Sequence, residues 1–141
     1  MARVFAVQGL YTFDVHDRSL DLSTVIFDTI EVFNVYVQEV KNMNMQLLKI
    51  LIEGTIDNLE SIDERLESHL SAEWQLSRLP LLVKEIMRVG VFELISGPQP
   101  SHAMTNAMII NEYLELAKVF ACEEDTPFIN GVLDAIQKEV K

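Results

Sequence analysis

The sequence is poor in the residues that crosslink small domains or bind metals. Among its 141 residues there is a single cysteine, Cys122, so an intramolecular disulfide is impossible. The three histidines are far apart, and no two His or Cys residues have the close spacing of a zinc site. We therefore expect no disulfide framework, no metal site and no cofactor.

Long apolar runs are also missing. No stretch approaches the roughly 18 uncharged apolar residues of a membrane-spanning helix. The N-terminus lacks the basic region, apolar core and small-residue cleavage site of a signal peptide. These two absences predict a cytoplasmic protein without membrane contact.

Positive charge is scarce. The chain has 11 Lys and Arg against 22 Asp and Glu, which gives a formal net charge of −11. Phosphate contacts need clustered Lys and Arg, so this balance argues against broad binding to nucleic acid. It favours either plain solubility or a basic protein partner.

Sequence signatures of catalysis are absent as well. There is no Gly-rich phosphate loop, no Gly-flanked serine and no HExxH motif. The lone Cys122 is followed by Glu123, Glu124 and Asp125, and adjacent carboxylates disfavour a thiolate nucleophile. We therefore predict a binding protein and not an enzyme.

What the chain does contain is apolar residues at helical spacing almost throughout. Glycine and proline are few, five and four, and mark only a few breaks. The helical segments are expected at about 2–15, 26–40, 45–70, 79–94, 103–120 and 126–140. Six to seven amphipathic helices without a strand pattern predict an all-α fold of two small packed bundles.

The domain organisation follows from the turn that holds the only tryptophan. We expect one domain over 1–141, with subdomains of approximately 1–72 and 73–141 on either side of the turn around Trp74. Gly54 lies inside a predicted helix, where glycine costs about 1 kcal/mol relative to alanine. Its presence there predicts that another helix approaches closely.

Three stretches carry a resemblance to a known family. They read ARVFAVQGLY from residue 2, EWQLSRLPLLVKEIMRVGVFELI from residue 73, and IINEYLELAKVF followed by FINGVLDAI from residue 109. The combination of INE-x3-LAK, F-x-NG-x-LD and R-x4-EL is specific. Over almost the whole chain the sequence resembles the NusB family of bacterial transcription antitermination factors.

The resemblance implies a two-subdomain helical fold and two partners. One is NusE, a small ribosomal protein, and the other is the boxA sequence of ribosomal RNA leader transcripts. The NusB–NusE pair acts within the antitermination complex of RNA polymerase. Some relatives dimerise, so a homodimer is possible.

Two other hypotheses remain open. One is a helical protein-binding adaptor without RNA affinity. The other is a module of RNA modification, because NusB-like domains also occur at the N-terminus of ribosomal RNA cytosine methyltransferases. The chain has no Gly-rich methyl-donor segment.

The resemblance also implies RNA-contacting residues. Arg3 matches the end of the family's arginine-rich N-terminal segment, and its alternative is a solvated terminal arginine. Lys118 of the LAK motif, with Phe128 and Asn130 of FINGVLD, matches positions near the RNA surface. The Asn130 amide could instead hold the interhelical turn.

Contacts with the partner protein are carried over in the same way. Tyr11 matches an aromatic that contacts NusE in the family, and its alternative is a core tyrosine. Arg88 matches the arginine of the central helix and serves either the partner or an internal ion pair. Gly131, in the NG pair, is expected to permit close helix packing.

The sequence departs from the family in its charge. Many members carry several arginines before the position of Arg3, whereas this chain begins almost there. Together with the acidity, this departure predicts weak autonomous RNA binding that depends on a basic partner.

Overall fold

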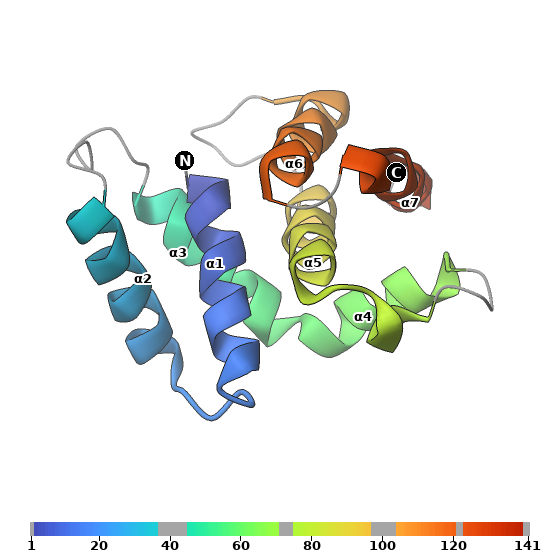
Figure 1. Cartoon of the computed structure of the whole chain (residues 1–141). Helices are drawn as coiled ribbons and strands as arrows, with labels where there is room; N and C mark the ends of the chain where they lie inside the picture. The colour runs from blue at the N-terminus through green and yellow to red at the C-terminus, as the bar shows by residue number, and fades with distance from the viewer. Residues whose placement is uncertain (1, 37–44, 71–74, 97–103, 121–122, 140–141) are drawn as a thin grey trace.

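The computed structural model describes residues 2–36, 45–70, 75–96, 104–120 and 123–139 (Figure 1). These residues form helices and no strand, which confirms the predicted all-α class. The elements are α1 (Ala2–Val15), α2 (Leu22–Tyr36), α3 (Met45–Asp57), α4 (Leu59–Ser68), η2 (Leu76–Arg78), α5 (Leu81–Ser96), α6 (Asn106–Phe120), η3 (Glu123–Asp125) and α7 (Thr126–Glu139).

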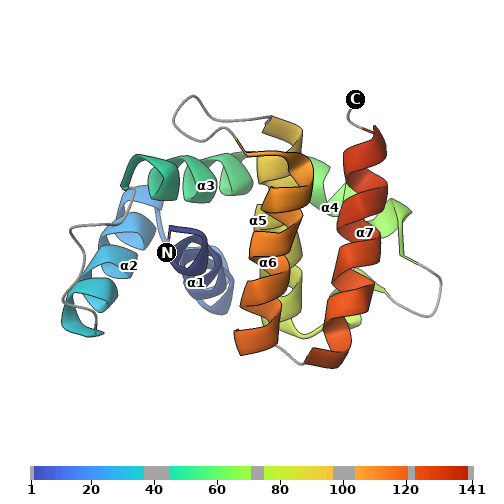
Figure 2. The same cartoon turned by 90° about the horizontal axis from the view of Figure 1, so that it is seen from above.

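The helices form two packed groups, as expected (Figures 1 and 2). Helices α1, α2 and α3 pack on one another, and α5, α6 and α7 form the second group. Helix α5 also packs against α1, α3 and α4, so it joins the two groups. The predicted subdomain boundary at residue 72, like Trp74, lies outside the described residues and stays a prediction.

One continuous core runs through both groups. Its fully buried side chains include Leu10 of α1, Leu48 of α3, Ile62 of α4, Ile86 of α5 and Leu133 of α7. Full burial of such a side chain stabilises the fold by about 1.5–3 kcal/mol. The apolar side chains of α1 therefore pack in the same core as those of helices much later in the chain.

The segment 45–70 was expected to be one helix, and this expectation is wrong. The structure divides it at Asn58, whose φ of −112° and ψ of 17° leave the helical region. The Asn58 side-chain amide donates to the Gly54 carbonyl at 2.8 Å. Asparagine competes in this way with the helical ladder. The break lets α4 turn toward α5 and α7.

The two glycine predictions have opposite outcomes. A Cβ on Gly54 would lie only 1.9 Å from the ring of Phe92 in α5, so the predicted close approach is confirmed. A Cβ on Gly131 would meet nothing within 4 Å. The close packing expected there is wrong, because Gly131 lies on the exposed side of α7. None of the described helices is long and apolar enough to cross a membrane.

Candidate interaction surface

A groove of about 370 Å³ lies between α1, α5 and α6. Most of the side chains along it are apolar. It is lined by Val4, Val7, Gln8, Tyr11 and Thr12 of α1, Leu82 and Ile86 of α5, and Leu116 and Phe120 of α6. The α1 members recur every three to four residues, which places them on one side of the helix. We call this feature the apolar groove.

Two aromatic side chains at the apolar groove remain open to solvent. Tyr11 is 41% exposed and Phe120 is 44% exposed. Val119, the residue before Phe120 in α6, is 72% exposed. Tyr11 therefore is not the core tyrosine that the sequence left open, and it stands where a partner can reach it.

Arg3 anchors the N-terminal end of α1 in the interior. Its guanidinium donates to both carboxylate oxygens of Glu93 in α5, at 2.8 and 2.6 Å. The Tyr113 hydroxyl of α6 donates to the same carboxylate at 2.7 Å. Burial opposes the charge of Arg3, but the bonds to Glu93 outweigh it and raise the pKa of the guanidinium. At 9% exposure Arg3 is not the solvated terminal arginine considered above, and its donors face inward.

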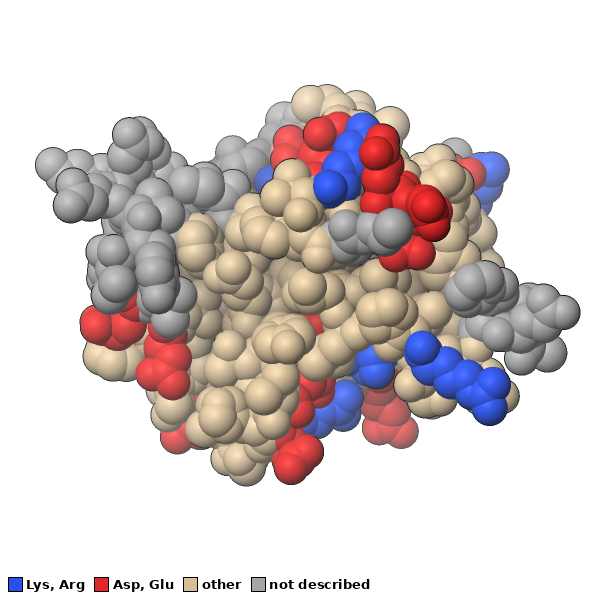
Figure 3. All heavy atoms as spheres, in the orientation of Figure 1, with Lys and Arg blue, Asp and Glu red and all other residues tan. Residues whose placement is uncertain are grey.

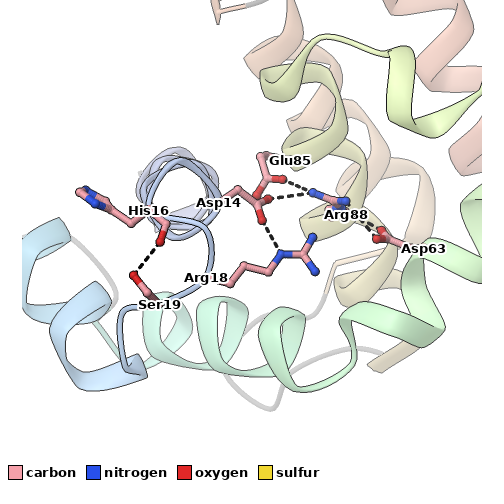
Figure 4. Close-up of polar contacts among 7 residues, drawn as sticks. All are labelled: Asp14, His16, Arg18, Ser19, Asp63, Glu85 and Arg88. Atoms are coloured by element: carbon pink, nitrogen blue, oxygen red, sulfur yellow. Dashed lines mark hydrogen bonds and ion pairs between the residues drawn. The ribbon is translucent and has the colours of Figure 1, made fainter.

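Arg88 anchors the other end of α1 (Figure 4). It donates to both oxygens of Asp63 in α4, at 2.8 and 3.0 Å, and to Asp14 in α1 at 2.9 Å. It also pairs with Glu85, one turn earlier in α5, while Arg18 binds Asp14 at 2.7 Å. Arg88 is 4% exposed. Of its two predicted roles, the structure shows the internal ion pair.

The Arg88 cluster contains a carboxyl that keeps its proton near neutral pH. Burial, and then the nearby Asp14, raise the pKa of Glu85 to about 8. Burial alone would raise the pKa of Asp14 too, but hydrogen bonds from Glu85 and Arg18 lower it. Among the described residues, no hydrogen-bond donor reaches Glu85 Oε2. This is expected where the carboxylate of Glu85 contacts the carboxylate of Asp14, because both groups accept hydrogen bonds. A proton on Glu85 turns that contact into a hydrogen bond to Asp14.

The remaining predicted site residues gather where α6 ends and α7 begins. Lys118 and Asn130 are both exposed, and Phe128 is half-buried against the core. Lys118 bonds Glu115 at 3.1 Å, and Glu123 and Glu124 of η3 are exposed nearby. The structure thus brings Lys118 and Asn130 to one edge, whereas Arg3 and Arg88 lie inside.

Sequence reasoning missed most of the apolar groove. Leu82, Leu116 and Phe120 were not singled out, because their apolar side chains resemble core positions. A usable signal lies in α1, where the apolar residues Val4 and Tyr11, two turns apart, lie beside the buried stripe. A helix with apolar residues on two faces has more than one neighbour to bury them against.

Comparisons with known proteins agree with this architecture. The model of the NusB family matches residues 1–138. The chain is 38% identical over 104 residues to the transcription antitermination protein NusB of a Nitratiruptor species, covering 74% of this chain and 70% of that protein. The structure is similar to that of T. maritima NusB, with a TM-score of 0.75, 25% identity, and 98% and 89% of the two chains covered.

A further similar structure contains partners. It is a crystal structure of the antitermination factors NusB and NusE in complex with double-stranded RNA. The matched chain is 29% identical with a TM-score of 0.71, and 98% of this chain and 94% of that chain are covered.

Proposed function

Because this chain belongs to the NusB family, we propose that it is an antitermination factor that acts by recognition and not by catalysis. It docks NusE in the apolar groove, with Tyr11 as a central contact. With NusE bound, it contacts boxA RNA along the edge that carries Lys118 and Asn130. Arg3 and Arg88 support this surface from the interior.

The apolar groove with its exposed aromatics carries the protein-docking half of the proposal. Monomeric proteins rarely leave large contiguous apolar patches in water without an interaction partner. Tyrosine is enriched among the residues that dominate binding energy at interfaces. Tyr11 and Phe120, together with the other apolar residues that line the groove, supply such a patch on a frame of three helices.

The RNA half of the proposal rests on fewer contacts. The edge offers one exposed cation, Lys118, and the Asn130 side chain, which bonds no other described residue. Glu115 pairs with Lys118, and the exposed Glu123 and Glu124 belong to η3, which contacts both α6 and α7. Such an edge contributes orientation and base contacts, while a basic partner supplies most of the attraction for phosphate.

The test is a titration of labelled boxA RNA with the chain, with and without NusE. We expect NusE to raise the RNA affinity, and Tyr11→Ala to abolish that gain by weakening NusE binding about 30-fold, or about 2 kcal/mol. Met108→Ala is the matched control, because Met108 of α6 is exposed like Tyr11 but does not line the apolar groove.

Two outcomes would contradict the proposal. Equal RNA affinity with and without NusE would remove the cooperative mechanism. A Tyr11→Ala variant that binds NusE as well as the native chain would remove the apolar groove as the docking site. NusE binding without any RNA binding would instead favour the adaptor hypothesis, which the acidic surroundings of Lys118 support.

A further inference from the structure

The apolar groove does not end at α1. A second hollow lies between α1 and α2, lined by Gln8, Thr12, Asp28, Thr29 and Glu31. Gln8 and Thr12 line the apolar groove as well, so the two hollows meet across α1. We call the second hollow the acidic recess.

The acidic recess contains several hydrogen-bond acceptors but few donors among the described residues. Asp28 and Glu31 are exposed, and neither forms an ion pair with another described residue. They are three positions apart on α2, where like charges repel each other. The Thr12 and Thr29 hydroxyls donate to carbonyls of their own helices, at 3.1 and 2.7 Å. A cation placed here would relieve the repulsion and find several oxygen ligands.

The surface view shows how the two hollows relate. Over α1 and toward α6 the surface is mostly free of charge, and acidic side chains border it over α2 (Figure 3). Phosphate would be repelled at that border, so the combination suits a protein and not RNA. An apolar centre with a charged margin is the usual arrangement of a protein interface.

We propose that the apolar groove and the acidic recess together bind one segment of the partner protein, in which an apolar anchor is followed by a Lys or Arg. The anchor enters the apolar groove beside Tyr11, and the cation reaches Asp28 and Glu31. This inference rests on the proposed function, since it describes how the partner is recognised at the same site.

The width of α1 sets the spacing within that segment. A helix with its side chains is roughly 10–12 Å across. An extended chain advances about 3.3 Å per residue, so the cation lies about three residues from the anchor if the segment is extended. The bound segment would then cross α1 over Gln8 and Thr12, with its anchor on one side of the helix and its cation on the other.

The experiment compares two double variants that remove the same charge. Asp28→Asn with Glu31→Gln neutralises the acidic recess, and Glu60→Gln with Glu64→Gln neutralises two exposed carboxylates of α4, away from it. Association with NusE is followed at several salt concentrations. We expect the first variant to bind about tenfold more weakly at low salt, mainly through a slower association rate and with a shallower salt dependence. The α4 variant should change less than twofold.

The outcomes separate this inference from the proposed function. Native-like NusE binding by the Asp28/Glu31 variant, with the native chain binding normally, overturns the acidic recess alone. Equal weakening in both variants overturns it too, because net charge would then explain the effect. If the native chain does not bind NusE, the proposed function itself fails. Unfolding curves of both variants check that these exposed changes leave the fold intact.

Discussion

Helix α1 is tied to α5 at both ends by ion pairs, but the two ends are built differently. At the N-terminal end the cation belongs to α1, and Arg3 meets the single carboxylate of Glu93. At the C-terminal end the cation that joins the two helices belongs to α5, and Arg88 meets three carboxyl groups, from Asp14, Asp63 and Glu85. Arg18 adds a second positive charge at Asp14. The first end is balanced in charge, and the second has an excess of acid.

The difference shows how the buried charged groups at each end are neutralised. At the balanced end, burial raises the pKa of Tyr113 well above its ordinary value, so its hydroxyl keeps donating to Glu93. At the acidic end, neutrality is approached by leaving a proton on Glu85. The apolar groove lies between the two ends, so both fix Tyr11 relative to Leu82.

Removing Arg88 should break the acidic end and give the largest effect. Arg88→Ala leaves three buried or half-buried carboxyl groups around an empty position. Loss of one partner of a buried ion pair costs about 3–5 kcal/mol. Urea unfolding at pH 7 measures it, with Lys84→Ala on the same helix as the control, since Lys84 pairs with no described carboxylate. If Arg88→Ala and Lys84→Ala lowered the free energy of unfolding by similar amounts, the Arg88 cluster would not be essential for stability.

Removing Arg3 should have a smaller effect at the balanced end. In Arg3→Met, Glu93 still accepts the hydrogen bond from the Tyr113 hydroxyl. We therefore expect the free energy of unfolding to fall by about 1.5–3 kcal/mol, the range for hydrogen bonds to charged groups. The control is Arg65→Met, whose partly exposed pair with Glu139 spans 3.8 Å and should contribute less than about 1 kcal/mol. If Arg3→Met instead left unfolding unchanged and weakened RNA binding, Arg3 would be a surface contact.

The two anchors also mark the limit of what the sequence predicts. Apolar spacing is local, so it places the helices, and Gly54 correctly indicates a close neighbour. The pairing of Arg3 with Glu93 joins residues 90 positions apart. The resemblance singles out both arginines, yet nothing in their sequence neighbours indicates that a carboxylate from a distant helix lies opposite.

Tyr11 and Gly131 show the same limit at the surface. The resemblance singles out Tyr11, but its exposure depends on α5 and α6 leaving a hollow beside α1. Gly131 shares the helical context of Gly54, and only the packing of α7 shows that nothing opposes it. The break at Asn58 is accompanied by a side-chain hydrogen bond to the Gly54 carbonyl, which the apolar period does not reveal.

The smallest predicted effect concerns Glu85 and appears as a dependence on pH. The pKa of Glu85 is about 8 in the folded protein, against an ordinary value of 4.5. Between these values the folded state holds a proton that the unfolded state has lost. The free energy of unfolding therefore falls as pH rises from about 4.5 to 8. This contribution is complete below pH 4.5 and is lost as pH passes through 8.

Glu85→Gln should remove that dependence, because its amide imitates the protonated carboxyl. The amide oxygen can accept from Arg88, and the amide nitrogen can donate to Asp14. We expect Glu85→Gln to gain about 1–2 kcal/mol of stability relative to the native chain between pH 7 and pH 8.5. Urea unfolding at both pH values measures the difference from the native chain, and Glu64→Gln controls for losing one exposed carboxylate. A variant less stable than the native chain at pH 7 would mean that Glu85 is already ionised there and needed as a partner of Arg88. The acidic end would then resemble the balanced one.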